Sequence, residues 1–287
     1  SSDLTGIVKT AEDFGSQGEW PSHPELLDWL AREFVESGWN IKHMHKLIVT
    51  SATYRQDSTI PPSLLEKDSG NRSLSYFPRM RLEAEAIRDV AMAASGLLDK
   101  SIGGESIYPY QPPGLWEQVA FQGTRKWNLS EGEKNYRRGL YVYWRRSIPY
   151  ASFVTFDAPS RETCTVKRPR TNTPLQALVL MNDPVYVEAA CSFGLRIMAE
   201  GGDKLDERIR FAFRVALSRE PSDDELSEIR QAFLVELSHF ESDRPAANQL
   251  VHVGESSPPL ETDICELAAW TIIGNILLNL DETITKG

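Results

Sequence analysis

The chain contains 287 residues and carries a net charge of −10, with 41% hydrophobic and 25% charged residues. This composition is typical of a globular protein, and the acidic balance argues against non-specific binding to nucleic acid or to an anionic membrane. The most apolar stretch, "ELAAWTIIGNILLNLDE", is too short and too interrupted to cross a bilayer. We therefore expect neither a nucleic-acid partner nor a membrane span.

Charge is distributed unevenly along the chain. Residues 125–170, called the basic span below, contain eleven basic and four acidic side chains. The span carries +7 and leaves −17 on the other residues. A positive segment in an acidic protein indicates contact with acidic groups, either of a ligand or of the protein itself.

Three cysteines, Cys164, Cys191 and Cys265, lie far apart and form no CxxC pair. A zinc site needs closer pairs, so we predict no metal site. The favoured interpretation is buried free thiols, and one disulfide stays open if the protein is exported. Because the chain has no CxxCH motif, it attaches no c-type haem itself, and we expect no cofactor in it.

Two helices are predicted near the N-terminus. The first follows Ser22, which with Glu25 forms a capping-box pattern, and Gly38 can close its end. Its leucines and aromatic residues would fall mainly on one face, which predicts a buried stripe. Asn40 is expected to cap the second helix, over residues 41–51.

The pentapeptide "KHMHK" raises the question of a metal site at His43 and His45. On a helix two such side chains diverge by roughly 200°, so they cannot bind one ion together. We predict that His45 lies on the apolar face, as a core or interface residue, and that His43 lies nearer the surface.

The middle of the chain is predicted to hold loops, one helix and one strand. We expect a loop at 57–77, a helix over 81–98, an irregular aromatic-rich segment at 99–135 and a strand at 137–147, "RRGLYVYWRRS". Glu83, Glu85 and Asp89 are interpreted as a solvated stripe of the helix rather than as acid–base carboxylates.

The C-terminal half is predicted to be helical. Thr173, Pro174 and Gln176 form a capped helix start, and a second helix follows Asp183 to about Glu200. Two more helices are expected over 203–218 and 221–241, the second with a capping box of Ser222 and Glu225, then a polar loop at 242–259 and a closing helix over 260–280.

Together these elements predict a mainly α fold, a helical domain with a small β element and long ordered loops. We expect a single domain over residues 1–287. A possible subdivision separates a helical part (1–100), a loop and strand part with the basic segment (101–172) and a second helical part (173–287).

The densest polar pattern lies in "FDAPSRETCTVKRPRTNTPLQALVLMNDP", residues 156–184. Arginine forks bind carboxylate, sulfate or phosphate, and a helix start at Thr173 offers free N–H groups. One hypothesis is therefore an anion-binding pocket. The other, which we favour, is an internal ion-pair network in which acidic residues of the segment neutralise its arginines. The candidate ligand-binding residues are Asp157, Arg161, Glu162, Arg168, Arg170 and Asn172.

No catalytic constellation is recognisable in the sequence. Ser160 has no local histidine, and GxSxG, P-loop, GxGxxG and HExxH patterns are absent. The catalytic residues, if the protein is an enzyme, are therefore unknown at this point.

Several blocks resemble one family: "EDFGSQGEWPSHPELLDWLAREFVESGWNIKHMHKLIVTSATYRQ", "YQPPGLWEQVAF", "YRRGLYVYWRRS", the segment 156–184 and "LAAWTIIGNILLNLDETI". It is the planctomycete-type C-terminal domain of unknown function found in proteins with a cytochrome-c-like domain (PSD-type family). The resemblance covers nearly the whole chain and transfers no catalytic residue. It implies an exported protein, periplasmic or at the cell surface. It also implies upstream partner domains, one of which can hold haem, and the loss of the domain's first elements from this chain.

Two interpretations of function follow. The favoured one is a non-catalytic interaction or ligand-binding module, which binds an anion, an acidic polysaccharide or a partner domain of the same polypeptide. The alternative is part of an enzyme, a carbohydrate-directed hydrolase or a haem-linked oxidoreductase, whose site is completed by upstream domains.

Overall fold

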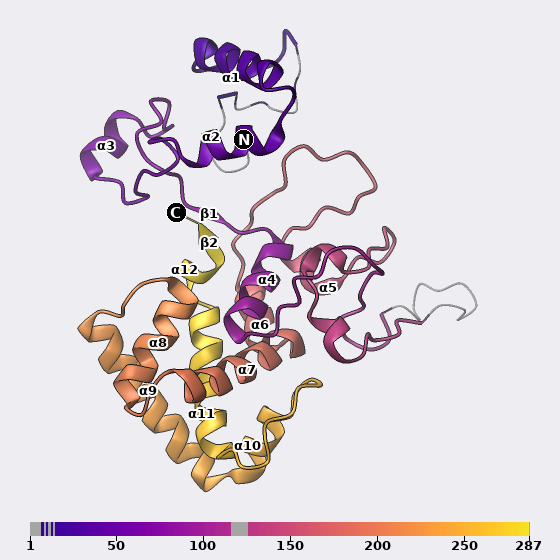
Figure 1. The fold of residues 1–287 in the computed structure, drawn as a ribbon, viewed down its shortest axis with the longest axis vertical. Coiled ribbons are helices and arrows are strands. Elements are labelled where there is room, and N and C mark those ends of the chain that lie inside the picture. Colours follow the sequence, from indigo (N-terminus) through magenta and orange to yellow (C-terminus); the bar gives the residue numbers. More distant parts are fainter. Residues whose placement is uncertain (1–6, 9, 11–12, 14, 116–125, 287) are drawn as a thin grey trace. The chain divides into compact units, whose positions relative to one another are not determined.

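The computed structural model describes residues 7–8, 10, 13, 15–115 and 126–286 (Figure 1). Helices dominate it, and the one sheet among the described residues has two short strands, so the predicted mainly α fold is confirmed. The chain divides into two compact units. The N-terminal unit contains Ser1–Arg81, Cys164–Arg168 and Thr285–Gly287, and the helical unit contains Leu82–Thr163 and Pro169–Ile284. The predicted single domain and its subdivision stay predictions.

The N-terminal unit is built from short elements. They are α1 (Pro24–Glu36), α2 (Ile41–Val49), α3 (Pro62–Lys67), β1 (Met80–Arg81) and β2 (Thr285–Lys286). Met80 pairs with Lys286 in the antiparallel sheet, so the end of the chain completes this unit. Lys286 also contacts the hydroxyl of Tyr54 and lies over its ring.

The two predicted N-terminal helices are confirmed, but two of their details are not. Asn40 caps α2 by accepting from the N–H of His43 at 3.0 Å. Ser22 does not cap α1, because its hydroxyl bonds the carbonyl of Ile7 instead and His23 takes the cap position. The predicted buried stripe is absent, since neither helix contains a buried residue and Trp29 is 48% exposed.

Both histidines lie on α2, as predicted, but His43 is the more buried of the two and His45 the more exposed. His43 is half-buried, and its Nε2 lies 2.7 Å from the carboxylate of Glu33, whereas His45 is exposed. The expectation that His45 is the more buried of the two is wrong. The reason is that α1 packs against the side of α2 that carries His43 and supplies a carboxylate partner there.

The helical unit carries most of the core. Its helices are α4 (Ala84–Ser95), η2 (Gly132–Tyr136), η3 (Gly139–Tyr141), α5 (Ala151–Thr155), α6 (Pro174–Asn182), α7 (Pro184–Glu200), α8 (Leu205–Leu217), α9 (Asp223–Ser242), α10 (Arg244–Val251), α11 (Ile264–Leu278) and α12 (Asp281–Ile284). The apolar helix α11 packs against α7 and α9 (Figure 1). It is buried on nearly every face, which explains why its sequence has no polar side.

Close packing of α7 on α11 depends on small residues. A Cβ atom at Gly194 would lie 3.2 Å from the Cβ of Trp270, and one at Gly274 would lie 3.0 Å from the carbonyl oxygen of Ala190. Trp270 is fully buried, and its ring centroid lies 4.4 Å from that of Phe233 on α9. Larger residues at either glycine would push the two helices apart.

The predicted caps of the C-terminal half are confirmed. Capping boxes start α6 at Thr173 and α9 at Ser222, and Asp183 caps α7 by accepting from the N–H of Val185 at 3.0 Å. The predicted loop at 242–259 is wrong in part, because α10 forms within it. Asp243 caps that helix by accepting from the N–H of Ala246.

The predicted strand at 137–147 is also wrong. The segment forms the 3-10 turn η3 and two isolated parallel bridges, one between Arg137 and Asp99 and one between Val142 and Ile107. Leu140 and Val142, which would share a face of such a strand, differ in burial: Leu140 is 64% exposed while Val142 is buried. Ile107 bonds the backbone of Tyr141 and of Tyr143, but the bridge does not continue into a ladder, so the alternation of apolar residues here does not mark a strand.

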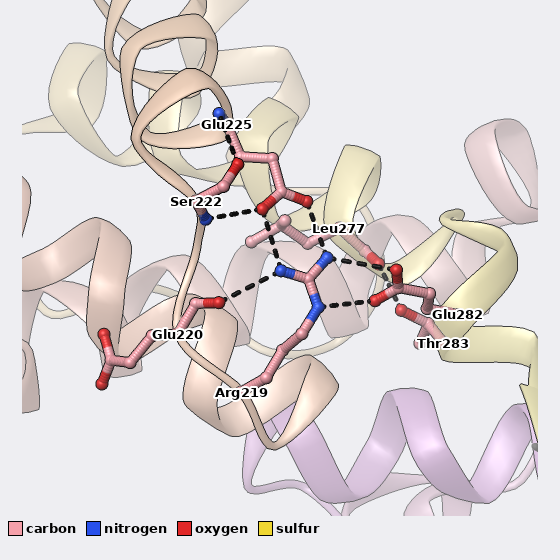
Figure 2. Close-up of polar contacts among 7 residues, drawn as sticks. All are labelled: Arg219, Glu220, Ser222, Glu225, Leu277, Glu282 and Thr283. Atoms are coloured by element: carbon pink, nitrogen blue, oxygen red, sulfur yellow. Dashed lines mark hydrogen bonds and ion pairs between the residues drawn. The ribbon is translucent and has the colours of Figure 1, made fainter. Parts of the chain in front are cut away.

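An arginine network links the α8–α9 turn to α12 (Figure 2). Arg219 donates to both carboxylate oxygens of Glu225, at 2.6 and 2.9 Å, and to those of Glu282, at 2.8 and 3.2 Å. Its remaining bond goes to the carbonyl of Glu220. These hydrogen bonds hold the pKa of Glu225 at about 2, chiefly through Arg219. All three nitrogens of this guanidinium therefore donate hydrogen bonds within the protein.

Within the described residues no helix is both long enough and apolar enough to cross a membrane.

Candidate functional site

The predicted binding residues lie in the connection between α5 and α6, residues 157–172, called the arginine loop below. Its central residues, Cys164–Arg168, group with the N-terminal unit, while the flanking parts belong to the helical unit. Arg168 is half-buried in the first of these groups. The other five candidates lie in the second group, where they are described together.

The base of the arginine loop is fixed by Asp157 and Thr171. Asp157 has a φ of 61°, in the left-handed region. Its carboxylate accepts from the backbone N–H of Thr171 at 2.8 Å and from the Thr171 hydroxyl at 2.9 Å. The buried amide of Gln176 donates to the same hydroxyl at 3.2 Å and to the carbonyl of Thr155 at 2.9 Å. These hydrogen bonds therefore hold the two ends of the arginine loop together, where it leaves α5 and where it reaches α6.

Arg161 lies against an aromatic ring rather than a carboxylate. Its guanidinium carbon is 4.8 Å from the ring centroid of Trp144. The indole N–H of Trp144 donates to the carbonyl of Ser160 at 3.1 Å, which places the ring beneath the turn. Arg161 is exposed, and no described carboxylate forms an ion pair with it. Its φ of 64° lies in a region that few side chains adopt without a compensating contact.

The remaining candidates occupy the surface of the loop. Glu162, Arg170 and Asn172 are all exposed. The backbone N–H of Glu162 donates to the hydroxyl of Ser160 at 3.3 Å, and the Glu162 side chain forms no ion pair among the described residues. Arg161 and Glu162 are thus adjacent in sequence without forming an ion pair with each other.

A second polar group, missed in the sequence, lies inside the helical unit. Arg88 on α4 is 1% exposed, and its two terminal nitrogens donate to the carbonyls of Arg137 at 2.6 Å and Asn135 at 2.5 Å. The Nε atom of Arg88 is buried without a hydrogen-bond partner among the described residues. The adjacent Asp89 accepts from the N–H of Gly139 at 2.6 Å.

Two buried tyrosines and the carboxyl group of Asp183 interact electrostatically with this guanidinium. Tyr150 and Tyr186 are each 1% exposed, and their hydroxyls are buried without a partner in the described residues. Burial raises the pKa of both phenols, and the charges of Arg88 and Asp183 both act on them. Burial also raises the pKa of Asp183 to about 6, opposed by the Val185 N–H and by Arg88. Arg88, Tyr150, Tyr186 and Asp183 are called the buried tyrosine cluster below.

The helical periodicity of residues 81–98 already contained a signal for this cluster. Arg88 shares a face with Ala84, Ile87 and Ala91, all of which are buried. An arginine on an apolar face has to find buried acceptors. Asp89 was expected on a solvated stripe, but it is half-buried, and burial is the main cause of its raised pKa. That expectation is wrong for Asp89, whereas Glu83 is exposed as predicted.

The cysteines are free thiols in the structure. Cys191 and Cys265 are buried as expected, and their Sγ atoms point to the carbonyls of Val251 and Phe240. Cys164 is exposed, so the expectation of burial is wrong for it. No group of three potential metal-ligating side chains occurs in the part of the chain that the structure describes.

Comparisons with known proteins place the chain in a family without assigning it an activity. A search of curated proteins and a search of solved structures each found no match. A family model matches residues 5–233, which include the arginine loop and the whole buried tyrosine cluster. The match ends within α9, so the core helix α11 lies beyond it. The chain belongs to the PSD1 family, described as a protein of unknown function (DUF1553).

Proposed function

We propose that this protein is a non-catalytic module that binds an acidic polysaccharide through the surface formed by Arg161 and Trp144. One observation carries the proposal. Arg161 is exposed, stacks on the Trp144 ring at 4.8 Å and has no carboxylate partner among the described residues. An exposed guanidinium retains donors for a ligand carboxylate or sulfate, and an indole offers an apolar face to a sugar ring.

Local charge favours an acidic ligand although the whole chain is acidic. The basic span carries +7 against −17 for the rest of the chain. The span includes Arg125, which lies outside the described residues, and the exposed Arg146. Because charges in solution are screened beyond about 8–10 Å at physiological ionic strength, an acidic chain end or branch would respond mainly to the nearby arginines. We expect binding to weaken steeply with salt.

The arginine loop is preorganised at its base, which favours binding. Asp157, Thr171 and Gln176 hold the two ends of the loop together with hydrogen bonds of 2.8–3.2 Å. Less conformational entropy is then lost when a ligand orders Arg161. The same bonds explain how a polar segment keeps one conformation without a helix or strand.

The proposal is tested by titrating the chain with polygalacturonate, which carries carboxylates, with dextran sulfate and with neutral dextran. Isothermal calorimetry at low and at physiological salt measures each affinity. We expect both acidic polymers to bind and neutral dextran not to bind. Arg161→Ala should weaken binding about tenfold, the effect of losing one charge-assisted hydrogen bond. Arg161→Lys should restore part of it, since it keeps the charge but loses the planar fork.

A matched control is Arg244→Ala, which removes the same charge from another exposed position of the helical unit. Its affinity should equal that of the wild type. Equal weakening in both variants would indicate a general charge effect and contradict the proposed site. Release of reducing ends from polygalacturonate would instead support the enzyme interpretation.

We also propose that the module works in an exported protein, beside upstream domains of the same polypeptide that include a haem domain. This part rests on the family resemblance alone. Fractionation of cells that produce the full-length protein tests it, with the periplasm or cell surface as the expected location. Recovery of the intact protein from the cytoplasm would contradict it.

A further inference from the structure

We propose that α1 and α2 form the interface of a homodimer, in which α1 of one copy packs on α2 of a second copy about a two-fold axis. The inference concerns the N-terminal unit and does not rest on the polysaccharide site. Two observations carry it: the apolar sides of both helices are only partly covered, and the two helices carry opposite net charges.

The apolar residues of α1 and α2 recur at helical spacing and form one side of each helix. The residues of this surface, called the hairpin face below, are Leu26, Leu30, Phe34, Ile41, Met44 and Ile48. Leu26, Ile41 and Ile48 are exposed, the other three are half-buried, and neither helix contains a buried residue. Helices of this length gain most of their stability from a covered apolar side. Contact between α1 and α2 alone leaves the hairpin face open.

Trp39 lies in the connection between α1 and α2, next to the hairpin face. Its side chain is 66% exposed, and its ring meets that of Phe34 edge-on, with 5.1 Å between the centroids. Its φ of 61° lies in the left-handed region, which a bulky residue adopts only where its surroundings hold it. The Trp39 N–H donates to the carbonyl of Phe34 at 2.9 Å and helps to hold it. A tryptophan fixed at the surface in this way is typical of the residues that anchor protein–protein interfaces.

The charges of the hairpin are divided between its two helices. α1 carries four carboxylates and one arginine, a net −3, whereas α2 carries two lysines and no carboxylate, a net +2 with its histidines neutral. Glu33 is used within the copy, where its carboxylate lies 2.7 Å from Nε2 of His43. Five further charges are exposed and form no ion pair among the described residues: Glu25, Asp28, Glu36, Lys42 and Lys46.

A second copy is the partner that fits this division of charge. A partner of one uniform charge would be repelled by α1 or by α2. A two-fold axis instead brings α1 onto α2 twice, so that acidic residues face basic ones in both contacts, whereas α1 on α1 would oppose like charges. The second copy also matches in size, because α1 is about 20 Å long and α2 about 14 Å long in both copies. The result is a four-helix arrangement in which each hairpin covers the apolar side of the other.

The first experiment is sedimentation equilibrium of the full chain at physiological salt, over concentrations from nanomolar to micromolar. We expect a reversible equilibrium between monomer and dimer. Trp39→Asn removes the indole, and asparagine tolerates the left-handed backbone. The variant should weaken the dimer about tenfold or more, because the anchor is lost from both copies. The control is Leu260→Asn, which removes an exposed apolar side chain from the helical unit and should leave the dissociation constant unchanged.

A charge exchange tests the pairing of α1 with α2. One variant reverses α2 with Lys42→Glu and Lys46→Glu, and the other reverses α1 with Asp28→Lys and Glu36→Lys. Each variant alone opposes like charges in both contacts, so its dimer should be about tenfold weaker than that of the wild type. A mixture of the two variants has opposite charges in both contacts and should form a heterodimer about as stable as the wild-type dimer.

Circular dichroism checks that each variant is folded, and if Trp39→Asn is not, the charge exchange decides alone. The proposal is overturned by a wild-type chain that stays monomeric at every concentration, and a monomer that floats with phosphatidylcholine vesicles would assign the hairpin face to a lipid surface instead. It is equally overturned by a folded Trp39→Asn variant that dimerises as tightly as the wild type, or by charge-reversed chains that form no heterodimer when mixed.

Discussion

Arg219 and Arg161 belong to the same helical unit and have opposite surroundings. Arg219 uses its guanidinium on two carboxylates and a carbonyl, and so joins the α8–α9 turn to α12 (Figure 2). Arg161 lies on an indole ring, exposed, without a carboxylate partner among the described residues. The comparison shows that an arginine's role depends on its acceptors and not on how basic its sequence neighbourhood is.

The difference has a physical origin in the local sequence. Arg219 precedes an acidic helix start, where Glu225 is held in place by the N–H of Ser222, so a carboxylate is already positioned. Glu162 follows Arg161 directly, but the turn directs the Glu162 backbone to Ser160. An arginine–carboxylate network of this kind thus lies at a place that the basic span does not include.

Arg88 extends the comparison to the interior, and its loss should have the largest effect. Arg88→Met keeps most of the volume and removes the donors to the carbonyls of Arg137 and Asn135. Leaving buried acceptors unpaired costs about 3 kcal/mol in unfolding free energy. Urea unfolding measures it. A loss below about 1 kcal/mol would mean that these bonds do not hold α4 to the 135–139 segment.

Asp183 should make stability depend on pH in the sense opposite to an ordinary paired carboxylate. Its folded pKa is about 6 against an ordinary 3.8, so the folded state binds more protons between these values. Stability from this group is fully present below about pH 4 and is lost as the pH rises through 6, by about 3 kcal/mol.

Asp183→Asn isolates this titration, because asparagine also caps helices well. The variant should show a flatter stability profile between pH 4 and 6 in chemical denaturation at fixed ionic strength. An unchanged slope would assign the pH dependence to other groups.

Arg219→Ala should cost about 1 kcal/mol, because its partners Glu225 and Glu282 are partly exposed and solvent weakens such pairs. Glu225 has a folded pKa of about 2, below its ordinary 4.5, so its contribution is present above pH 4.5 and is lost as the pH falls toward 2. Because Arg219→Ala removes the main cause of this low pKa, the unfolding free energy of the variant should fall less steeply than that of the wild type between pH 4.5 and 2. A variant as acid-sensitive as the wild type would contradict this.

Arg161→Ala should have the smallest effect on stability, within about 0.5 kcal/mol, because an exposed side chain without ion pairs contributes little. Thermal unfolding compared with Arg244→Ala measures it. A loss near that of Arg219→Ala would show that the Trp144 contact supports the fold and would weaken the case for a binding role.

Helix capping patterns predicted where many helices begin, but they did not predict which side chains contact each other. Caps at Asn40, Thr173, Asp183 and Ser222 are local signals, and each helix start is where it was expected. The strand at 137–147 failed because apolar alternation does not reveal whether a neighbouring strand exists. The cluster around Arg88 was missed because its acceptors lie some 50 residues away, at Asn135 and Arg137.

The basic character of the arginine loop was easier to predict than the contacts that its side chains make. Arginines in a polar segment predicted a basic surface, and Gln176 as a capping partner predicted where α6 begins. Neither pattern indicated that Asp157 would bind Thr171, or that Trp144 would lie beneath Arg161. Both contacts depend on positive φ values at Asp157 and Arg161, which are set by the folded loop.

The most direct test measures two variants in two assays: Arg161→Ala and Arg219→Ala, each for polygalacturonate affinity and for unfolding free energy. We predict that Arg161→Ala loses affinity and keeps its stability, and that Arg219→Ala loses stability and keeps its affinity at temperatures where it is folded. If Arg161→Ala instead binds as the wild type does and unfolds more easily, the exposed guanidinium is structural and the binding proposal is wrong.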